Sequence, residues 1–303
     1  MSRIEFLTRA GGVRLDAAVA EAAGISRTLV ARLIEGGKVL VDGVPRSRSY
    51  KVSSGQVVSA DVPDAVAKRP PAAEDIDVVV RYEDESLLVV SKPAGLVVHP
   101  GPGHESGTLV NALLARAGRP SGGEAMRPGI VHRLDAGTSG LMIVAKDEMA
   151  FDRLSEMMAN REVSRTYIAL VEGIPSTTTG TIDAPIGRSP KHRKKMAVVA
   201  GGRDAVTDFR VKESFADAAL LEVKPRTGRT HQIRVHLAAA GHAVVGDAVY
   251  GKDRKLARRL ELERPFLHAA ALRFAHPLTG APVEIDDPMP EDLTAALAML
   301  RAQ

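Results

Sequence analysis

The chain has 303 residues, of which 45% are hydrophobic and 26% are charged. This balance is ordinary for folded globular proteins, so it excludes a predominantly disordered chain. No apolar run approaches the roughly 20 residues that a membrane-spanning helix needs, and no charged-then-apolar signal segment follows Met1. We therefore expect a cytoplasmic protein of about two domains with no membrane partner.

Cysteine and tryptophan are both absent from the sequence. The lack of cysteine excludes disulfides, thiolate nucleophiles and every zinc or iron–sulfur site that uses cysteine ligands. Aromatic residues make up only 3% of the chain. This scarcity argues against RNA recognition through the stacked aromatic platform of an RRM-like domain.

The positive charge is concentrated in one part of the chain. The formal net charge is +4, yet residues 188–234 contain 12 basic and 5 acidic residues, a net of +7, which leaves −3 for the rest. Such a concentration predicts a polyanionic partner. The alternative is a solvated face that only contributes solubility.

Residues 12–62 predict a small basic module of two helices and short strands. Apolar residues in GVRLDAAVAEAAG recur at helical spacing, and Ser26 is a candidate N-cap for RTLVARLIEGG, which ends at a glycine pair. Two β-rich runs follow, KVLVDG and GQVVSADV, with the turn-forming pair Asp42 and Gly43 between them.

This module resembles the S4 RNA-binding domain, on the run ISRTLVARLIEGGKVLVDG and the preceding RLDAAVA. The resemblance implies that exposed basic side chains bind RNA phosphates and shape, without catalysis. The candidates are Arg27, Arg32 and Lys38. A generic helix-hairpin adaptor remains the alternative.

Residues 63–75 (PDAVAKRPPAAED) predict an extended linker, because adjacent prolines block regular structure. Residues 76–303 then form a second domain. Short β runs and helical stretches alternate there without a strict βαβ rhythm, so we predict an α+β fold with a mostly antiparallel mixed sheet. The expected strands are DVVVRYED, LLVVSKPAG, GLMIVAKD, RTYIALVEG, TDFRVKES and ALLEVKP, and the expected helices are TLVNALLARAG, EMAFDRLSEMMANRE, THQIRVHLAAAG and EDLTAALAMLRAQ.

Several motifs of common enzyme classes are missing. The sequence has no P-loop, no dinucleotide fingerprint, no H-E-x-x-H and no G-x-S-x-G elbow. His231 and His236 are five residues apart, which places them on different faces of a helix and argues against shared metal ligation. We therefore expect neither a cofactor nor a metal site.

Two polar motifs remain as candidates for chemistry. GIVHRLDAGTSGLMIVAKD predicts a loop and then an apolar strand, with Asp135 at the lip of the loop. GRTHQIRVHL predicts a turn and then a helix that carries Arg234 within its first turns. A buried pair of these two side chains would keep the carboxylate ionised. A structural salt bridge without catalysis is the alternative.

Taken together, HRLDAGTSG, SRTYIALVEG and TGRTHQIRVHL are similar, in this order, to the three signature motifs of the RluA-type pseudouridine synthase family. SKPAGLVVHPGPG resembles the opening motif of that family. With the S4-like module, the chain resembles the RluD-like ribosomal large-subunit branch from residue 12 to about residue 290.

The resemblance implies a role for four residues. Asp135 matches the catalytic aspartate, and Arg133 matches the arginine that enters the RNA stack where the target base leaves. Tyr167 matches the tyrosine that packs on the flipped base, and Arg234 matches the arginine paired with the carboxylate. The implied activity is isomerisation of specific uridines to pseudouridine in 23S ribosomal RNA or its precursor. The same chemistry on transfer RNA and a catalytically silent ribosome-assembly factor are the alternatives.

A basic run between these motifs predicts further RNA contacts. RSPKHRKKM suits a flexible loop that follows phosphates, and its binding should depend strongly on salt. Its candidates are Arg188, Lys191, Arg193, Lys194 and Lys195. Arg229 is expected to bind phosphate or to brace its loop. We expect the protein to act as a monomer.

Overall fold

The computed structural model describes residues 2–8, 11–25, 27–62, 71–101, 104–117, 128–192, 195–251 and 254–303. The chain forms two compact units, residues 1–70 and 71–303, and each is described by itself below. Of the predicted linker, only residues 71–75 lie in the described ranges. In that stretch, the carbonyl of Ala72 accepts a hydrogen bond from the side-chain amide of Asn111, and the backbone N–H of Glu74 donates to the carbonyl of Asn111.

The described residues of the first unit form two helices and a four-stranded antiparallel sheet in the order β1-β4-β2-β3. Both predicted helices are present. Their apolar faces pack with the sheet around a core that includes Leu15, Val30 and Val58. The elements are β1 (Ser2–Leu7), α1 (Leu15–Ala23), α2 (Arg27–Glu35), β2 (Val39–Val41), β3 (Val44–Pro45) and β4 (Val57–Val62).

Two details of the first unit differ from the expectation. The turn at Asp42 and Gly43 joins β2 to the short strand β3, not to the longer run that forms β4. The Asp42 carboxylate instead accepts a hydrogen bond from the backbone N–H of Val57, at the start of β4. Strand β1 was not predicted; it pairs with β4 along its whole length. The expected N-cap, Ser26, lies outside the described residues.

In the described part of the second unit, nine strands form one sheet in the order β5-β6-β7-β14-β8-β13-β12-β9, with β15 paired to β14. Its strands are β5 (Val79–Glu83), β6 (Leu87–Lys92), β7 (Ser139–Ala145), β8 (Ser164–Glu172), β9 (Thr179–Asp183), β12 (Val206–Ser214), β13 (Ala218–Pro225), β14 (Leu267–Ala275) and β15 (Pro282–Asp286). A separate hairpin pairs β10 (Ile186–Arg188) with β11 (Met196–Val198). The helices are α3 (Leu109–Ala117), α4 (Glu148–Asn160), α5 (Gln232–Ala239), α6 (Lys255–Arg259) and α7 (Glu291–Arg301).

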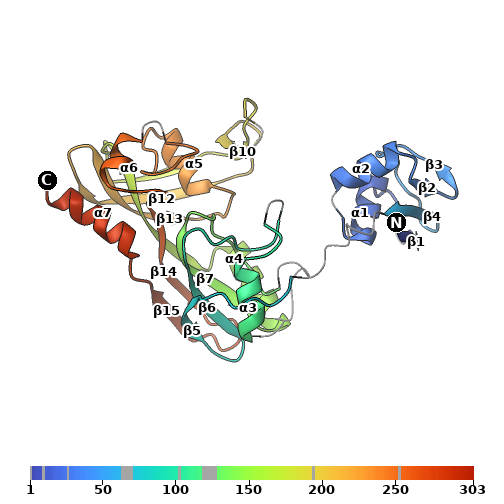
Figure 1. Cartoon of the computed structure of the whole chain (residues 1–303), viewed down its shortest axis with the longest axis horizontal. Helices are drawn as coiled ribbons and strands as arrows, with labels where there is room; N and C mark the ends of the chain where they lie inside the picture. The colour runs from blue at the N-terminus through green and yellow to red at the C-terminus, as the bar shows by residue number, and fades with distance from the viewer. Residues whose placement is uncertain are drawn as a thin grey trace. The chain divides into compact units, whose positions relative to one another are not determined.

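The sheet is mostly antiparallel, as predicted for an α+β fold. Among the strand pairs of the described residues, only β7 and β14 run parallel. In Figure 1, β5, β6 and β7 lie side by side toward one end of the sheet, and β12 and β13 lie toward the other. The central strand β14 was not predicted, nor were β9, β10, β11, β15 and α6.

Alternating side chains of the strands form cores on the two faces of this sheet. On one face, Met142 of β7 and Tyr167 of β8 cluster with apolar residues of α3 and α5. On the other face, α4 packs against β6 and β7, and α6 and α7 pack against β8 and β13. The face that carries α5 is therefore also the face to which Tyr167 points.

No helix in the part of the chain that the structure describes is long and apolar enough to cross a membrane.

Candidate active site

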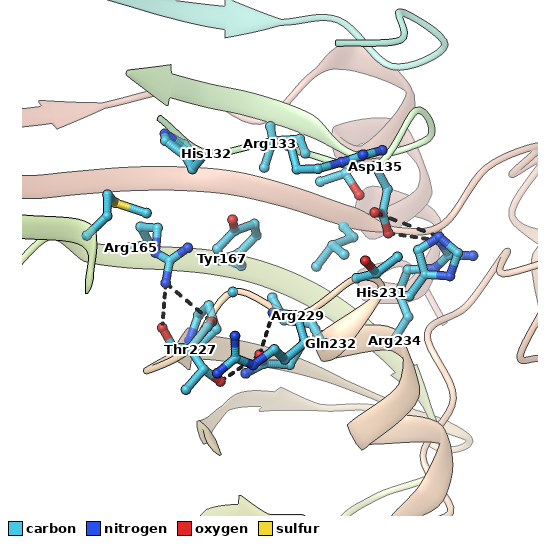
Figure 2. Close-up of a pocket in the computed structure, with 18 of the residues that line it drawn as sticks. His132, Arg133, Asp135, Arg165, Tyr167, Thr227, Arg229, His231, Gln232 and Arg234 are labelled. Atoms are coloured by element: carbon cyan, nitrogen blue, oxygen red, sulfur yellow. Dashed lines mark hydrogen bonds and ion pairs between the residues drawn. The ribbon is translucent and has the colours of Figure 1, made fainter. Parts of the chain in front are cut away.

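A pocket of about 320 Å³ lies on the α5 face of the sheet. Its walls come from the loop before β7, from β8 and from the segment that leads into α5, as Figure 2 shows. Five residues predicted for the site line this one cavity: Arg133, Asp135, Tyr167, Arg229 and Arg234. Motifs that are separated by up to about a hundred residues of sequence are thus assembled around one pocket.

Asp135 and Arg234 form a direct ion pair. Asp135 Oδ2 accepts a hydrogen bond from Arg234 Nη1 at 2.9 Å, and the two side chains are 18% and 9% exposed, respectively. In Figure 2 the carboxylate and the guanidinium face each other at one end of the pocket. The expected pair exists, and its partial burial strengthens the attraction between the two charges.

A second carboxylate fixes the other side of Arg234. Asp247 accepts from Arg234 Nε at 2.6 Å and from Nη2 at 2.9 Å, and its own side chain is fully buried. Burial opposes the charge of Arg234, but Asp247 and then Asp135 outweigh it and raise the pKa of the guanidinium. Likewise, burial opposes ionisation of Asp247, but hydrogen bonding to Arg234 lowers its pKa. The bidentate pair leaves one donor nitrogen for Asp135.

Hydrogen bonds of Gln232 hold the first turn of helix α5, which carries Arg234. The buried Gln232 accepts from Thr227 Oγ1 at 2.7 Å and from the backbone N–H of Arg229 at 3.0 Å. Its amide donates to the backbone carbonyl of Val206 at 2.9 Å and to Thr207 Oγ1 at 3.0 Å. One side chain therefore joins the preceding turn, the first turn of α5 and strand β12, which holds Arg234 in place.

Tyr167 forms an apolar wall of the pocket. It lies on β8, is 6% exposed and packs in the core cluster that includes Leu134, Ile233 and Leu267. Burial, assisted by the charge of Asp135 and opposed by that of Arg165, raises the pKa of its hydroxyl. The Tyr167 side chain is therefore a neutral ring between the cation of Arg165 and the carboxylate of Asp135 (Figure 2). Such a ring is suited to contact a flat uncharged group.

Arg133 and Arg229 lie at the pocket with different partners. Arg133 is exposed, and its Nη1 is 3.5 Å from His99 Nε2. Arg229 donates from Nε to the backbone carbonyl of Asp204 at 2.8 Å, so it braces its loop. Burial and the nearby charge of Arg203 lower the pKa of Arg229.

Among the described residues of the second unit, the predicted RNA contacts on the β10–β11 hairpin do not line the pocket. Arg188, Lys191 and Lys195 are exposed on the β10–β11 hairpin. Arg193 and Lys194 lie outside the described residues. In the first unit, Arg32 and Lys38 are exposed, and Arg27 donates to the nearly buried Asp16 at 2.9 and 3.0 Å. Hydrogen bonding from Arg14, with further help from Arg27, lowers the pKa of Asp16 to about 2.

Sequence reasoning missed several residues of this site. Asp247 and Tyr250 come from the run VVGDAVYG, where an acid and an aromatic in a glycine-flanked turn were the available signal. His231 was considered only as a metal ligand, yet its Nε2 is 3.9 Å from Asp135 Oδ1. Arg165 lines the pocket and donates to the carbonyls of Pro225 and Thr227.

Lys92, which lies in the motif SKPAGLVVHPGPG, is fully buried. Its Nζ donates to the carbonyls of Pro93, Leu96 and Ala136 at 2.8, 2.9 and 3.2 Å. The last of these adjoins Asp135, so the lysine ties the Asp135 loop to the chain after β6. Burial lowers the pKa of Lys92 to about 7, against the opposing effect of Asp135.

The two histidines considered for metal binding lie in different surroundings. His236 is buried and contacts Thr207 Oγ1 and the carbonyl of Ala184, whereas His231 lines the pocket. Within the described ranges, no group of three or more His, Asp or Glu side chains is arranged to hold a metal ion.

Comparisons with known proteins agree with this architecture. Residues 86–239 match the family model for RNA pseudouridylate synthase, and residues 13–58 match the S4 domain. The chain is 46% identical over 277 residues to an uncharacterized RNA pseudouridine synthase of Bacillus subtilis, covering 91% of this chain and 90% of the relative. It is 43% identical to ribosomal large subunit pseudouridine synthase D of Zymomonas mobilis, covering 95% and 94%.

The fold is similar to that of solved structures as well. The human RNA pseudouridylate synthase domain containing 1 superposes with a TM-score of 0.58 at 29% identity, covering 72% of this chain and 86% of that protein. The resemblance inferred from the sequence motifs is thereby confirmed. The chain belongs to the RNA pseudouridylate synthase family and combines its catalytic fold with an S4 domain.

Proposed function

We propose that this enzyme isomerises specific uridines of large-subunit ribosomal RNA to pseudouridine, with Asp135 as the catalytic carboxylate. The observation that carries the proposal is the Asp135–Arg234 ion pair, 2.9 Å long, in a pocket walled by Tyr167. The reaction breaks the N1–C1′ bond of uridine and joins C5 to C1′, so C5 loses a proton and N1 gains one. It has no net redox change and no group leaves.

Asp135 would act at the sugar. A carboxylate beside C1′ can serve as nucleophile, as base for the 2′ proton, or as electrostatic stabiliser of positive charge at C1′. Arg234 supports each of these roles, because its guanidinium, itself anchored by Asp247, favours the ionised carboxylate. A cysteine that attacks the base is excluded, because the chain has none.

The target uridine must leave its stack to reach this pocket, which costs a few kcal/mol in a duplex. Arg133, exposed at the pocket, can fill the vacated space with a planar cation. Tyr167 offers a flat face to the flipped base, and stacking of a base on an aromatic ring contributes about 1–3 kcal/mol. Binding outside the pocket would come from the basic groups of the hairpin and the S4 domain.

The names of two relatives support ribosomal RNA as the substrate. The matched proteins of Zymomonas mobilis and Pseudomonas aeruginosa are both named ribosomal large subunit pseudouridine synthase D, and the second is 45% identical over 96% of this chain. Both cover the S4 domain and the catalytic fold together.

Mapping of pseudouridines across total cellular RNA, with and without this protein, tests the substrate. We expect specific sites in large-subunit ribosomal RNA to disappear without the protein and to return when it is supplied. Loss of sites only in transfer RNA would replace the proposed substrate. No change in any RNA, together with a defect in ribosome assembly, would support a catalytically silent assembly factor instead.

A further inference from the structure

The turn at residues 247–250 contacts the site through two of its side chains. Asp247 holds Arg234, and the ring of Tyr250 lies with its centroid 5.1 Å from Arg234 Cζ. The hydroxyl of Tyr250 is 2.8 Å from His231 Nδ1, and the two rings meet edge to face. This turn therefore contacts both groups that face Asp135, the guanidinium of Arg234 and the imidazole of His231.

The same turn also anchors the β10–β11 hairpin. The backbone N–H of Met196 donates to the Tyr250 hydroxyl at 3.1 Å. The ammonium of the neighbouring Lys195 donates to the backbone carbonyl of Val249 at 2.8 Å. The hairpin carries the exposed Arg188 and Lys191, which are candidates for RNA contact. Tyr250 thus connects the basic β10–β11 hairpin to the pocket.

The two hydrogen bonds of the Tyr250 hydroxyl are compatible with one donor–acceptor order that leads from the hairpin to His231. The Met196 N–H occupies a lone pair of the Tyr250 oxygen, so the hydroxyl proton can be donated to His231 Nδ1. Neutral His231 then carries its own proton on Nε2, the nitrogen that is 3.9 Å from Asp135 Oδ1. Burial lowers the pKa of His231, which favours the neutral ring.

We propose that Tyr250 is a positioning residue that couples the β10–β11 hairpin to the Asp135 carboxylate, through His231 and Arg234. RNA bound on the basic hairpin would hold Met196 and Lys195 against the turn, and the turn would hold both side chains toward Asp135. The inference rests on the proposed catalytic role of Asp135. It adds that contact with RNA outside the pocket affects the chemical step.

Tyr250→Phe is the direct test, because it keeps the ring against Arg234 and removes both hydrogen bonds of the hydroxyl. We expect the single-turnover rate at saturating RNA to fall about tenfold, with the RNA dissociation constant within about twofold of the wild-type value. Tyr82→Phe is the matched control, since the Tyr82 hydroxyl donates to Asp84 at 2.6 Å away from the pocket. We expect it to keep the wild-type rate.

Coupling is measured by adding Lys195→Met to each background. In the wild type we expect this change to lower the saturated rate about threefold, and in Tyr250→Phe to add almost nothing. If the rate effects of Lys195→Met and Tyr250→Phe multiply in the double variant, the inference is overturned. It is also overturned if Tyr250→Phe changes only the RNA affinity. Equal losses of thermal stability and rate in Tyr250→Phe and Tyr82→Phe would do the same. A wild-type enzyme that converts no uridine would instead overturn the proposed function.

Discussion

Arg234 donates to both carboxylate oxygens of Asp247, at 2.6 and 2.9 Å, and keeps its remaining terminal nitrogen for Asp135. A pair of nearly the same shape lies on the surface, where Arg226 donates to Asp208 at 2.6 and 3.0 Å. The two pairs differ in burial: the side chain of Asp247 is 0% exposed and that of Asp208 is 30% exposed. Matched substitutions in the two ion pairs can therefore separate the effect of burial on stability from the effect of pair geometry.

Asp247→Asn should destabilise the enzyme by about 3 kcal/mol, because it leaves the buried Arg234 without its main counter-charge. The rate should fall as well, since Arg234 would no longer be held toward Asp135. Asp208→Asn should cost less than about 1 kcal/mol, as is usual for exposed pairs. Urea denaturation and single-turnover assays of both variants check this. Equal effects of the two substitutions would contradict a special role for the buried pair.

Tyr167 should contribute through its ring. Tyr167→Phe keeps an aromatic face in the pocket, whereas Tyr167→Leu removes the stacking partner that contributes about 1–3 kcal/mol to a flipped base. We expect kcat/KM to fall at least about tenfold further in the leucine variant than in the phenylalanine variant. Steady-state kinetics on an RNA transcript give the comparison. The opposite order, with leucine more active than phenylalanine, would exclude stacking as the role of this residue.

The motifs predicted several residues that line the pocket, because their spacing and residue types are local features of the sequence. Asp135, Tyr167 and Arg234 are brought together as expected. The contact that holds Arg234 in place was not predictable from local sequence features. Asp247 follows Arg234 by 13 positions and reaches it only after the chain has turned beyond α5. The run VVGDAVYG indicates an acid in a turn, but the partner of that acid is decided by tertiary packing.

Tertiary contacts also decide which parts of the fold the local sequence can predict. Strands with continuous β-branched and apolar runs, such as β6 and β7, were predicted correctly. The central strand β14 contains three successive alanines in LHAAALRFA, a composition that favours helix. It is a strand because β7, β8 and β15 pair with it. Strand β1 depends equally on its distant partner β4.

Gly140 lies where β7 meets β14, and its φ is +113°. A Cβ there would lie 2.3 Å from the carbonyl oxygen of Ala269, so Gly140→Ala forces two central strands apart. We expect a loss of about 3 kcal/mol or more in the free energy of unfolding. Gly280→Ala is the control: φ is +71° but no atom lies within 4 Å, and about 1 kcal/mol is expected. Similar urea midpoints for the two variants would refute the steric explanation.

His132 should make stability depend on pH. Its Nε2 accepts from the backbone N–H of Ile143 at 2.9 Å, and burial, with a smaller effect of Arg165, lowers its pKa to about 3. Between about pH 6.5 and 3, the unfolded chain binds a proton that the folded chain does not, so the free energy of unfolding falls as the pH falls.

Substitution of this histidine should weaken that dependence. From pH 7 to pH 5, the wild type should lose about 1 kcal/mol or more relative to His132→Gln, in which this position does not titrate. His192→Gln, at an exposed position on the hairpin, is the control and should follow the wild type. The comparison uses urea denaturation at each pH. Parallel curves for the wild type and His132→Gln would show that His132 is not held neutral.

The role of Asp135 is tested most directly by single-turnover conversion of uridine in a large-subunit ribosomal RNA transcript, with the wild type and Asp135→Asn, and with RNA affinity measured in parallel. Asparagine keeps the size of the side chain and removes its charge. We predict no detectable pseudouridine from the variant and an RNA dissociation constant within about threefold of the wild-type value, because affinity is spread over many basic groups. A variant that converts uridine at the wild-type rate, or one that loses RNA binding together with activity, would contradict the catalytic assignment.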